Sequence, residues 1–376
     1  MMDSCDVLVV GAGPAGSSLA WGLRNSGLGV IVMDKQTFPR NKTCAGWITP
    51  TVIKTLQLDM DHYAREHTLQ PVHGFRIGRI GDDTIDVCYG SDPVSYGIRR
   101  CEFDYYLLQR CKATLLTGEP FKHLQRKNNT WIVNNHIQAR LVVGAGGHFC
   151  PVARHLGARI GRAETAVTAQ EIEFKPNAGQ MNSCNVDAAM PELYFCPDLK
   201  GYGWILKKGD YLNIGLGRED KHKLSEHVAA FCEFLKARQK NHFDIPNRFD
   251  GHAYLLYQHS TRVKLADGIL LIGDAAGLAY TQSGEGIRPA IESGLVADEI
   301  IRKANGDYRI ENLSGYVDAI THRFGRQKPK YHNLPKLPDK LRQLLAQKLL
   351  KSHWFARNIV INRWFLHHDL PPLYSF

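Results

Sequence analysis

The strongest structural constraint in the chain is a glycine-rich turn close to its start. The segment "DVLVVGAGPAGSSLAWGLRNSGLGVIVMDK" joins an apolar run, the turn Gly11–Gly16, a stretch of helical spacing and a second apolar run that ends at Asp34. This order is typical of a buried β-strand, a tight turn, a helix and a parallel strand. The segment therefore predicts a Rossmann-like unit, a parallel sheet with helices packed on its faces.

The residue types in this turn also predict a ligand. Gly11 permits the sharp turn, Gly13 allows the backbone to approach a pyrophosphate, and Gly16 allows the helix to pack closely on the sheet. The start of the helix offers free N–H groups and a positive dipole end to phosphates. Asp34 can accept hydrogen bonds from ribose hydroxyls. The residues predicted to contact a dinucleotide are Gly11, Gly13, Pro14, Ala15, Gly16, Asp34 and Lys35. They leave FAD and NAD as alternatives.

A second glycine-rich stretch, roughly 260 residues later, decides between these cofactors. In "GILLIGDAAG" an apolar strand precedes Gly273 and Asp274, whose carboxylate can accept hydrogen bonds from a polyol. In "SGEGIRPAIESG" the glycines Gly284 and Gly286 permit close approach, and a helix begins near Ile287. Its N-terminal end would stabilise an anionic reduced flavin. A long ligand held at both ends is FAD, which we predict as the cofactor.

These motifs resemble those of a flavoprotein superfamily that contains aromatic hydroxylases, geranylgeranyl reductases and flavin-dependent halogenases. The resemblance implies that Asp274 contacts the ribityl chain and that the Gly284–Ile287 segment lies under the flavin pyrimidine. "IRRCEFDYYLL" is similar to the superfamily's Arg-x-x-Phe-Asp-x-x-Leu helix, whose arginine approaches FAD. This role falls on Arg100 rather than Arg99. The resemblance thus implies further cofactor contacts at Arg100, Gly273, Asp274, Gly284, Gly286 and Ile287.

The resemblance also implies the fold class. We expect an α/β, PHBH-like architecture, with a Rossmann-like FAD-binding domain, an inserted antiparallel β-sheet substrate domain and a helical C-terminal segment. Strand-like alternation dominates residues 165–257, which agrees with such an insertion. The predicted boundaries are 1–72, 99–162 and 262–305 for the FAD-binding domain, 73–98 and 163–261 for the substrate domain, and 306–376 for the basic, helical C-terminal segment.

Two further segments favour the geranylgeranyl reductase branch. "KGYGWILKKGDYLNIGLG" resembles that branch's aromatic strand and its following asparagine-bearing strand, although Leu206-Lys207 stands where the branch has Phe-Pro. Tyr202 and Trp204 alternate along one strand and so share a face. "KTCAGWITP" resembles the branch's cysteine-bearing loop near the flavin. We predict catalytic roles for Cys44, Tyr202 and Trp204, and substrate contacts for Lys42 and Trp47.

The predicted reaction is the transfer of a hydride from reduced flavin to a hydrophobic prenyl, quinone or carrier-bound substrate. A weak acid, such as a thiol or a bound water, must supply the matching proton. Cys44 is the candidate thiol, with a small apolar filler as its alternative role. NAD(P)H or another external donor would reduce the flavin. Gly146 stands where the superfamily has an aspartate that bears on NAD(P)H use, so the donor stays open.

Other functions remain open on the sequence alone, because a fold does not fix a reaction. The main alternative is an FAD-dependent monooxygenase that hydroxylates an aromatic substrate through a flavin C4a-hydroperoxide. A halogenase is less favoured, because the chain has no W-x-W-x-I-P motif. A flavin-bearing sensor without turnover is the third alternative.

Composition limits the location and the partners. The chain contains no run of about 18 apolar residues, so we predict no transmembrane helix. Its start does not resemble a signal peptide. Nine scattered cysteines without a CxxC pattern indicate a reducing cytoplasm. The adjacent His367 and His368 lack a closed ligand set, so no metal site is predicted.

The net charge of +10 is concentrated at the C-terminal end. Residues 319–376 hold eleven lysines and arginines but two aspartates. Such a segment can bind anionic lipid peripherally at a membrane surface or bind an acidic carrier protein. Alternatively, it can form a basic helix that is simply exposed to solvent. It has no nucleic-acid fold signature, so we predict no nucleic-acid partner. Its stretch "WFARNIVINRWFLHH" could lie on a membrane or pack over the substrate entrance.

Overall fold

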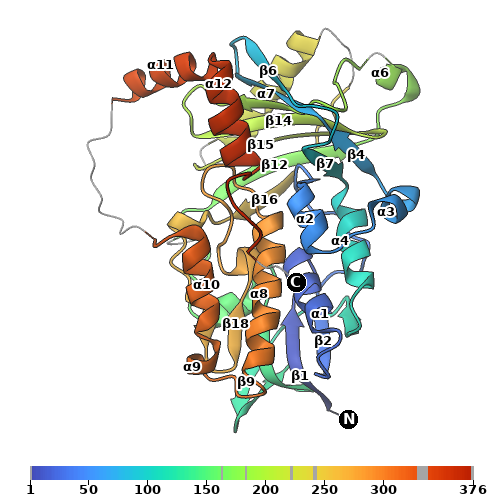
Figure 1. Ribbon diagram of the computed structural model, residues 1–376, viewed down its shortest axis with the longest axis vertical. Helices are drawn as coiled ribbons and strands as arrows, with labels where there is room; N and C mark the ends of the chain where they lie inside the picture. The colour runs from blue at the N-terminus through green and yellow to red at the C-terminus, as the bar shows by residue number, and fades with distance from the viewer. Residues whose placement is uncertain are drawn as a thin grey trace.

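The computed structural model describes residues 2–161, 164–182, 184–220, 223–239, 244–327 and 338–373. Part of the basic C-terminal segment, including Lys328, Lys330 and Lys336, lies outside the described residues. The described residues form two large sheets, one above the other in Figure 1, and a small third sheet.

The lower sheet is the Rossmann-like sheet that the sequence predicts. Its strand order is β17-β18-β11-β1-β2-β8, and β1 pairs in parallel with both β11 and β2. The strands are β1 (Asp3–Val10), β2 (Val30–Asp34), β8 (Thr114–Thr117), β11 (Ile137–Gly144), β17 (Leu265–Ala266) and β18 (Ile269–Leu271), with β10 (Thr130–Val133) and β9 (Leu124–Lys127) joined to β11. The apolar run Val7–Val10 is buried because helices cover this part of the sheet.

Helices bring the two glycine-rich turns together. α1 (Pro14–Leu23) and α8 (Ile287–Lys303) lie side by side (Figure 1). A Cβ atom on Gly294 of α8 would stand 2.5 Å from the carbonyl oxygen of Ala15 in α1. Further helices of this part are α4 (Arg100–Gln109), α5 (Pro151–His155), α9 (Ile310–Leu313) and α10 (Gly315–Phe324). The close packing explains why a glycine stands at position 294.

The upper sheet is the expected substrate sheet, with strand order β16-β12-β15-β14-β13-β5-β6. Its strands are β5 (Gly74–Arg79), β6 (Thr84–Cys88), β12 (Val167–Phe174), β13 (Glu192–Phe195), β14 (Gly201–Lys208), β15 (Tyr211–Arg218) and β16 (Asp250–Tyr254). It is antiparallel except at β13 and β5, which pair in parallel. Helix α7 (Leu224–Gln239) packs on it, and α6 (Ala178–Asn182) precedes β13.

A small sheet lies at the junction of the two large ones. It consists of β3 (Trp47–Ile48), β7 (Ser95–Ile98) and β4 (Leu69–Val72), and the short helices α2 (Pro50–Thr55) and α3 (Met60–Glu66) belong to the same region. The boundaries predicted from the sequence divide this sheet between two domains, and they remain a proposal.

The part of the C-terminal segment from α11 to Phe365 packs on the upper sheet. α11 (Asp339–Leu350) lies against the β5–β6 hairpin, where Gln347 donates to Asp82 at 3.2 Å. The short α12 (His353–Phe355) leads into the π-helical segment η3 (Ala356–Phe365). Phe365 of η3 is buried in one cluster with Trp47 and Trp204. Of the two positions considered for the "WFARNIVINRWF" stretch, η3 therefore takes the packed one.

Candidate active site

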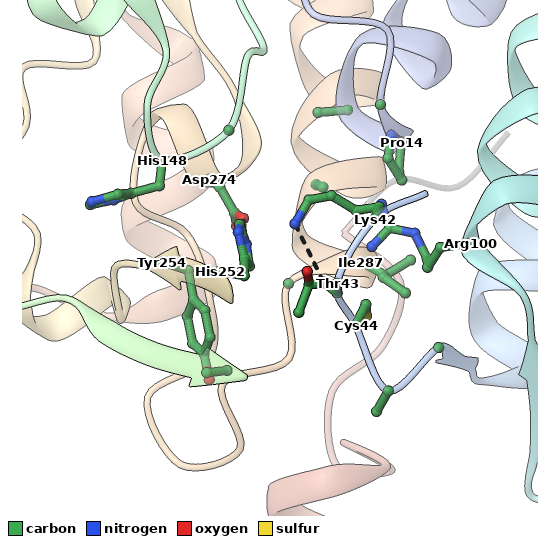
Figure 2. Close-up of a pocket in the computed structure, with 18 of the residues that line it drawn as sticks. Pro14, Lys42, Thr43, Cys44, Arg100, His148, His252, Tyr254, Asp274 and Ile287 are labelled. Carbon is green, nitrogen blue, oxygen red and sulfur yellow. Dashed lines mark hydrogen bonds and ion pairs between the residues drawn. The ribbon is translucent and has the colours of Figure 1, made fainter. Parts of the chain in front are cut away.

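A cavity of about 560 Å³ lies where the two glycine-rich turns, the loop around Cys44 and the upper sheet meet. All of the predicted site residues line it except Gly11, Gly16 and Gly273, which lie in the turns behind it. Figure 2 shows Asp274 and His252 on one side of the cavity, with Pro14, Lys42 and Arg100 on the other. The distant segments predicted from the sequence are thus brought to one place.

The first turn forms one end of the cavity. A Cβ atom on Gly11 would overlap the backbone of Ala145, and one on Gly16 would overlap the carbonyl oxygen of Gly11. Asp34 at the end of β2 accepts hydrogen bonds from the N–H groups of Ala12 at 2.8 Å and Gln36 at 2.9 Å. The turn and the carboxylate therefore hold each other in place at the start of α1.

The second turn packs directly on the first. A Cβ atom on Gly273 would stand 2.9 Å from that of Ala15, and the N–H of Gly273 donates to Ser293 of α8 at 2.9 Å. Gly284 has a φ of +71°, and a side chain there would overlap the hydroxyl of Tyr254. Asp274 lies 3.1 Å from the place where a Cβ of Gly286 would stand. These approaches require the glycines that the sequence presents.

Asp274 has a neutral partner and two cations nearby. Burial would raise the pKa of Asp274, but contact with His252 at 3.7 Å and the charges of Lys42 and Arg100 lower it. Burial, with help from the Lys42 cation, lowers the pKa of His252 to about 4, although Asp274 opposes the shift. Burial and Arg100 lower the pKa of Lys42 to about 8. Asp274 is therefore an anion beside an uncharged imidazole.

Arg100 is buried at the cavity wall and is not a surface arginine. Its guanidinium makes a two-pronged ion pair with Asp104, at 2.7 and 2.8 Å, and Arg40 approaches the same carboxylate at 3.3 Å. It also contacts the thiol of Cys44. Arg99 instead pairs with Glu102 and Glu173, away from this cavity. Of these two arginines, only Arg100 lines the cavity.

A buried polar network fixes the backbone around Cys44. Glu171 of β12 accepts a hydrogen bond from the Cys44 N–H, and Asn213 of β15 donates to Glu171 at 2.6 Å and to the Cys44 carbonyl at 3.3 Å. Asn213 also accepts from the Trp204 indole at 2.8 Å. Burial raises the pKa of Glu171 to about 7, the neighbouring Glu173 adds to this, and Lys208 opposes it. The network orients two of the three predicted catalytic residues together.

Aromatic side chains form the wall on the side of the upper sheet. The rings of Tyr202 and Trp204 lie 6.0 Å apart, as expected for alternate residues of one strand. Phe365 of η3 lies 5.3 Å from Tyr202 and 6.0 Å from Trp47. The hydroxyl of Tyr202 donates to the carbonyl of Ser283 at 2.5 Å. This contact ties the aromatic wall to the second turn.

The sequence did not single out several residues of this site. They are Arg40, His148, Glu171, His252, Tyr254 and Glu285, all of which either line the cavity or hold a residue that does. The alternation in "AQEIEF" was a usable signal for Glu171, because a carboxylate in a strand interior must find partners. His252 and Tyr254 lie on β16, and only its pairing with β12 brings them to the cavity.

Comparisons with known proteins agree with this geometry. Residues 4–71 match a family model described as an FAD binding domain. The chain is 27% identical over 380 residues to digeranylgeranylglycerophospholipid reductase 2 of Methanosphaera stadtmanae, with 93% of each chain covered. It is 28% identical over 320 residues to menaquinone reductase of Mycobacterium tuberculosis, covering 80% of this chain and 77% of that protein. A geranylgeranyl bacteriochlorophyll reductase-like protein from Thermoplasma acidophilum has the same fold, with a TM-score of 0.74, 23% identity and coverage of 93% and 88%.

The fold, the two glycine turns and these matches define an FAD-dependent oxidoreductase of PHBH-like architecture. This confirms the cofactor and the enzyme class predicted from the sequence. Over most of its length the chain is similar to proteins named as digeranylgeranylglycerophospholipid reductase and menaquinone reductase.

The residues present fit FAD. At the start of α1 the cap residue Gly13 has no side chain, and the guanidinium of Arg40 lies 3.4 Å from the place where its Cβ would stand. Gly286 occupies the same position at the start of α8. Asp34 and Asp274 supply one carboxylate at each end of the cavity. Two helix starts and two acids match a ligand with phosphates at one end and several hydroxyls along its length.

Proposed function

We propose that the enzyme reduces a carbon–carbon double bond or a quinone ring in a hydrophobic, prenyl-like substrate. The observation that carries this proposal is the composition of the cavity, where cofactor-binding turns and an aromatic wall face the same space. The related proteins from Methanosphaera and Mycobacterium are named as reductases of a digeranylgeranyl lipid and of menaquinone. A carrier-bound acyl group is the third substrate class that such a wall would accept.

For the cofactor, we propose that the Gly11–Gly16 turn and the start of α1 hold the pyrophosphate. Asp34 would bind the adenine-side ribose, with Lys35 beside it. Asp274 would bind the ribityl chain, and the Gly284–Ile287 segment would support the pyrimidine edge. Reduced FAD supplies a hydride to the substrate.

The chain's own residues would position the substrate and supply a proton. Tyr202, Trp204 and Trp47 offer flat apolar surfaces to an unsaturated chain or ring, and they exclude water from it. The thiol of Cys44 would donate the proton, and the guanidinium of Arg100 can pair with the thiolate that remains. Lys42, at the same wall, would contact a polar group of the substrate.

We infer that an external donor, NAD(P)H or a protein reductant, supplies the electrons. Gly146 lines the cavity without a side chain to contact a nicotinamide, next to His148 and Phe149. Anaerobic mixing with NADH, NADPH or dithionite, followed at the flavin absorbance, distinguishes the donors. Reduction by dithionite alone would identify a protein or another small molecule as the natural donor.

A product assay tests the reaction. The purified holoenzyme is reduced anaerobically, mixed with a geranylgeranyl lipid or a menaquinone, and the products are weighed by mass spectrometry. We expect a gain of two hydrogens, which the C44S variant should reduce strongly and a C88S control, altered at an exposed cysteine, should not. A gain of one oxygen in the presence of O2 would instead identify a monooxygenase, and a halogen gain would identify a halogenase.

We further propose that the protein works in the cytoplasm and docks on an anionic membrane through α11. Within the described residues, no helix is long and apolar enough to cross a bilayer. However, α11 exposes apolar side chains at helical spacing, Leu341, Leu344, Leu345 and Leu349, and Trp354 follows it with 65% of its surface exposed. Lys340, Arg342 and Lys348 on the same helix would attract anionic headgroups.

Vesicle sedimentation tests this docking. We expect the protein to bind vesicles that contain phosphatidylglycerol more strongly than vesicles of phosphatidylcholine alone. L344E should weaken the binding, whereas I310E, at another exposed apolar residue on α9, should not. Equal binding of the L344E variant would contradict the assignment to α11.

A further inference from the structure

Two buried polar atoms face one another where the C-terminal segment meets the loop before α8. Oε2 of Glu285 and Nε2 of His367 lie 3.4 Å apart, and their side chains are 8% and 4% exposed. Among the residues that the structure describes, neither atom has a hydrogen-bond partner under ordinary geometric criteria. Buried polar atoms without partners are rare in native proteins, so this pair needs an explanation.

The protonation states of Glu285 and His367 explain why neither atom has an ordinary hydrogen-bond partner. His367 is bonded through its ring to the backbone carbonyl of Arg363, which places its proton on Nδ1 and leaves a lone pair on Nε2. The other oxygen of Glu285, Oε1, accepts from the N–H of Arg288 at 3.2 Å. If Glu285 were ionised, the lone pairs of Oε2 would face the lone pair of Nε2, and the two acceptor atoms would repel each other. A protonated Oε2 can instead donate to Nε2 and satisfy both atoms at once.

We propose that Glu285 and His367 share one proton at neutral pH, and that this proton keeps the start of α8 free of negative charge toward the cofactor. The second half of this inference rests on the placement of the flavin rings beside Gly284 and Gly286 proposed above. Glu285 lies between these two glycines and lines the cavity. His367 lines a second, smaller cavity on the far side, so the pair lies between the two.

The surrounding charges favour the neutral pair. Burial raises the pKa of Glu285 to about 7, with Arg288 opposing the shift and Glu292 adding to it. Burial and the cations of Arg288 and Arg323 lower the pKa of His367 to about 3. The other titratable groups near the pair are Tyr202 of β14, Tyr280 of the loop before α8, and His368. An acid with a free proton thus faces an imidazole that carries no charge.

The protein holds His367 in an unusual conformation to make this contact. Its φ is +50°, a left-handed value that a residue with a side chain seldom adopts. Its ring lies 3.8 Å from that of Tyr280, and its carbonyl accepts from Arg288 at 3.3 Å. Strained residues that persist are over-determined by their surroundings and cluster at functional sites. His367 is accordingly a positioning residue, which acts through Glu285.

The electrostatic consequence follows from the helix. The N-terminal end of α8 carries a partial positive charge, which stabilises an anion placed before it. A reduced flavin is negatively charged at its pyrimidine edge, so this end favours the reduced form. An ionised Glu285 between the two glycines would oppose that effect. Loss of the shared proton should therefore lower the midpoint potential of the bound flavin.

Infrared spectroscopy tests the shared proton without any turnover. We expect the protein at neutral pH to show the carbonyl stretch of a protonated carboxylic acid, which shifts on exchange into D2O. The band should be absent in E285Q and present in the H368Q control, which alters the neighbouring histidine. If the wild type shows no such band, or if the band is still present in E285Q, the inference is overturned.

A second measurement tests the electrostatic role. The midpoint potential of bound FAD is measured against pH in the wild type and in E285Q, whose amide stays neutral and can still donate to His367. The two curves should coincide on the acid side of about pH 7, and the wild-type potential should fall below that of E285Q on the alkaline side. Curves that coincide throughout would overturn this role while leaving FAD binding intact. A protein that refuses FAD would overturn the proposed function and this role together, although the infrared band would still report the proton.

Discussion

Replacement of Asn213 by leucine tests the network that holds the candidate catalytic residues. Asn213 is fully buried on β15, and its amide makes strong hydrogen bonds to the Trp204 indole at 2.8 Å and to Glu171 at 2.6 Å. A leucine fills a similar volume but leaves both partners unsatisfied. Each buried group left without a partner costs roughly 1–3 kcal/mol, so N213L should lose about 2–6 kcal/mol. This is a large part of a typical unfolding free energy of about 5–15 kcal/mol.

The loss can be measured by urea denaturation of the holoenzyme, followed by circular dichroism at one fixed excess of FAD. The fixed ligand concentration matters because bound cofactor adds to the apparent stability. N312L serves as a matched control, because Asn312 is exposed and its side-chain amide donates to the carbonyl of Asp307 at 3.2 Å. It should change the free energy of unfolding by no more than about 0.5 kcal/mol.

The same substitution should also affect catalysis. Without Asn213 the Cys44 carbonyl loses a donor and the indole of Trp204 loses its acceptor, so kcat should fall more than the affinity for FAD. If N213L destabilises the protein by less than about 1 kcal/mol, the network does not hold these residues as described.

Three further outcomes are expected. G294A places a Cβ 2.5 Å from the Ala15 carbonyl and should weaken FAD binding about tenfold in a fluorescence titration. The control G315A, whose Cβ meets only the flexible end of Ile300 at 3.1 Å, should leave FAD binding unchanged. Equal affinities of the two variants for FAD would contradict the close packing of α1 and α8. F365A removes a fully buried ring and should cost about 3–5 kcal/mol in urea denaturation, whereas W354A, at an exposed ring, should cost little. Burial raises the pKa of Glu171 from its ordinary value of 4.5 to about 7 in the folded protein, so the stability that its neutral form contributes is complete below pH 4.5 and is lost as the pH rises through 7. Denaturation midpoints should therefore fall over that range by the equivalent of about 3 kcal/mol or less, and E171Q should remove this part of the pH dependence; an unchanged profile in E171Q would show that Glu171 does not titrate there.

The glycine-based half of the site could be predicted from the sequence because close approach leaves a visible pattern of glycines. At Gly11, Gly16 and Gly284 the backbone approaches a neighbour so closely that no other residue fits, whichever part of the chain supplies that neighbour. Arg100 was found through the resemblance to the superfamily, which also pointed to the strand that bears Asn213. Neither periodicity nor composition pointed to them.

The rest depends on how distant strands pair. His252 reaches the cavity because β16 pairs with β12, where it lies opposite Ala169. The partner of Glu285 is still harder to foresee, since it comes from a segment of the chain 82 residues later that crosses back over the start of α8. A single sequence does not reveal strand register or the path of such a segment, because both are decided by packing between parts far apart in the chain.

The interleaving of the two sheets also constrains the order in which the protein can form. β18, which completes the pairing of β11 in the lower sheet, follows β12–β16 of the upper sheet in the chain. During synthesis the first turn and α1 must therefore wait, with the apolar surface that later meets α8 uncovered, until nearly three hundred residues have emerged. Contacts across such separations form slowly, and uncovered apolar surface promotes aggregation in the meantime. With FAD held by both turns as proposed above, cofactor present during translation would shorten this vulnerable interval.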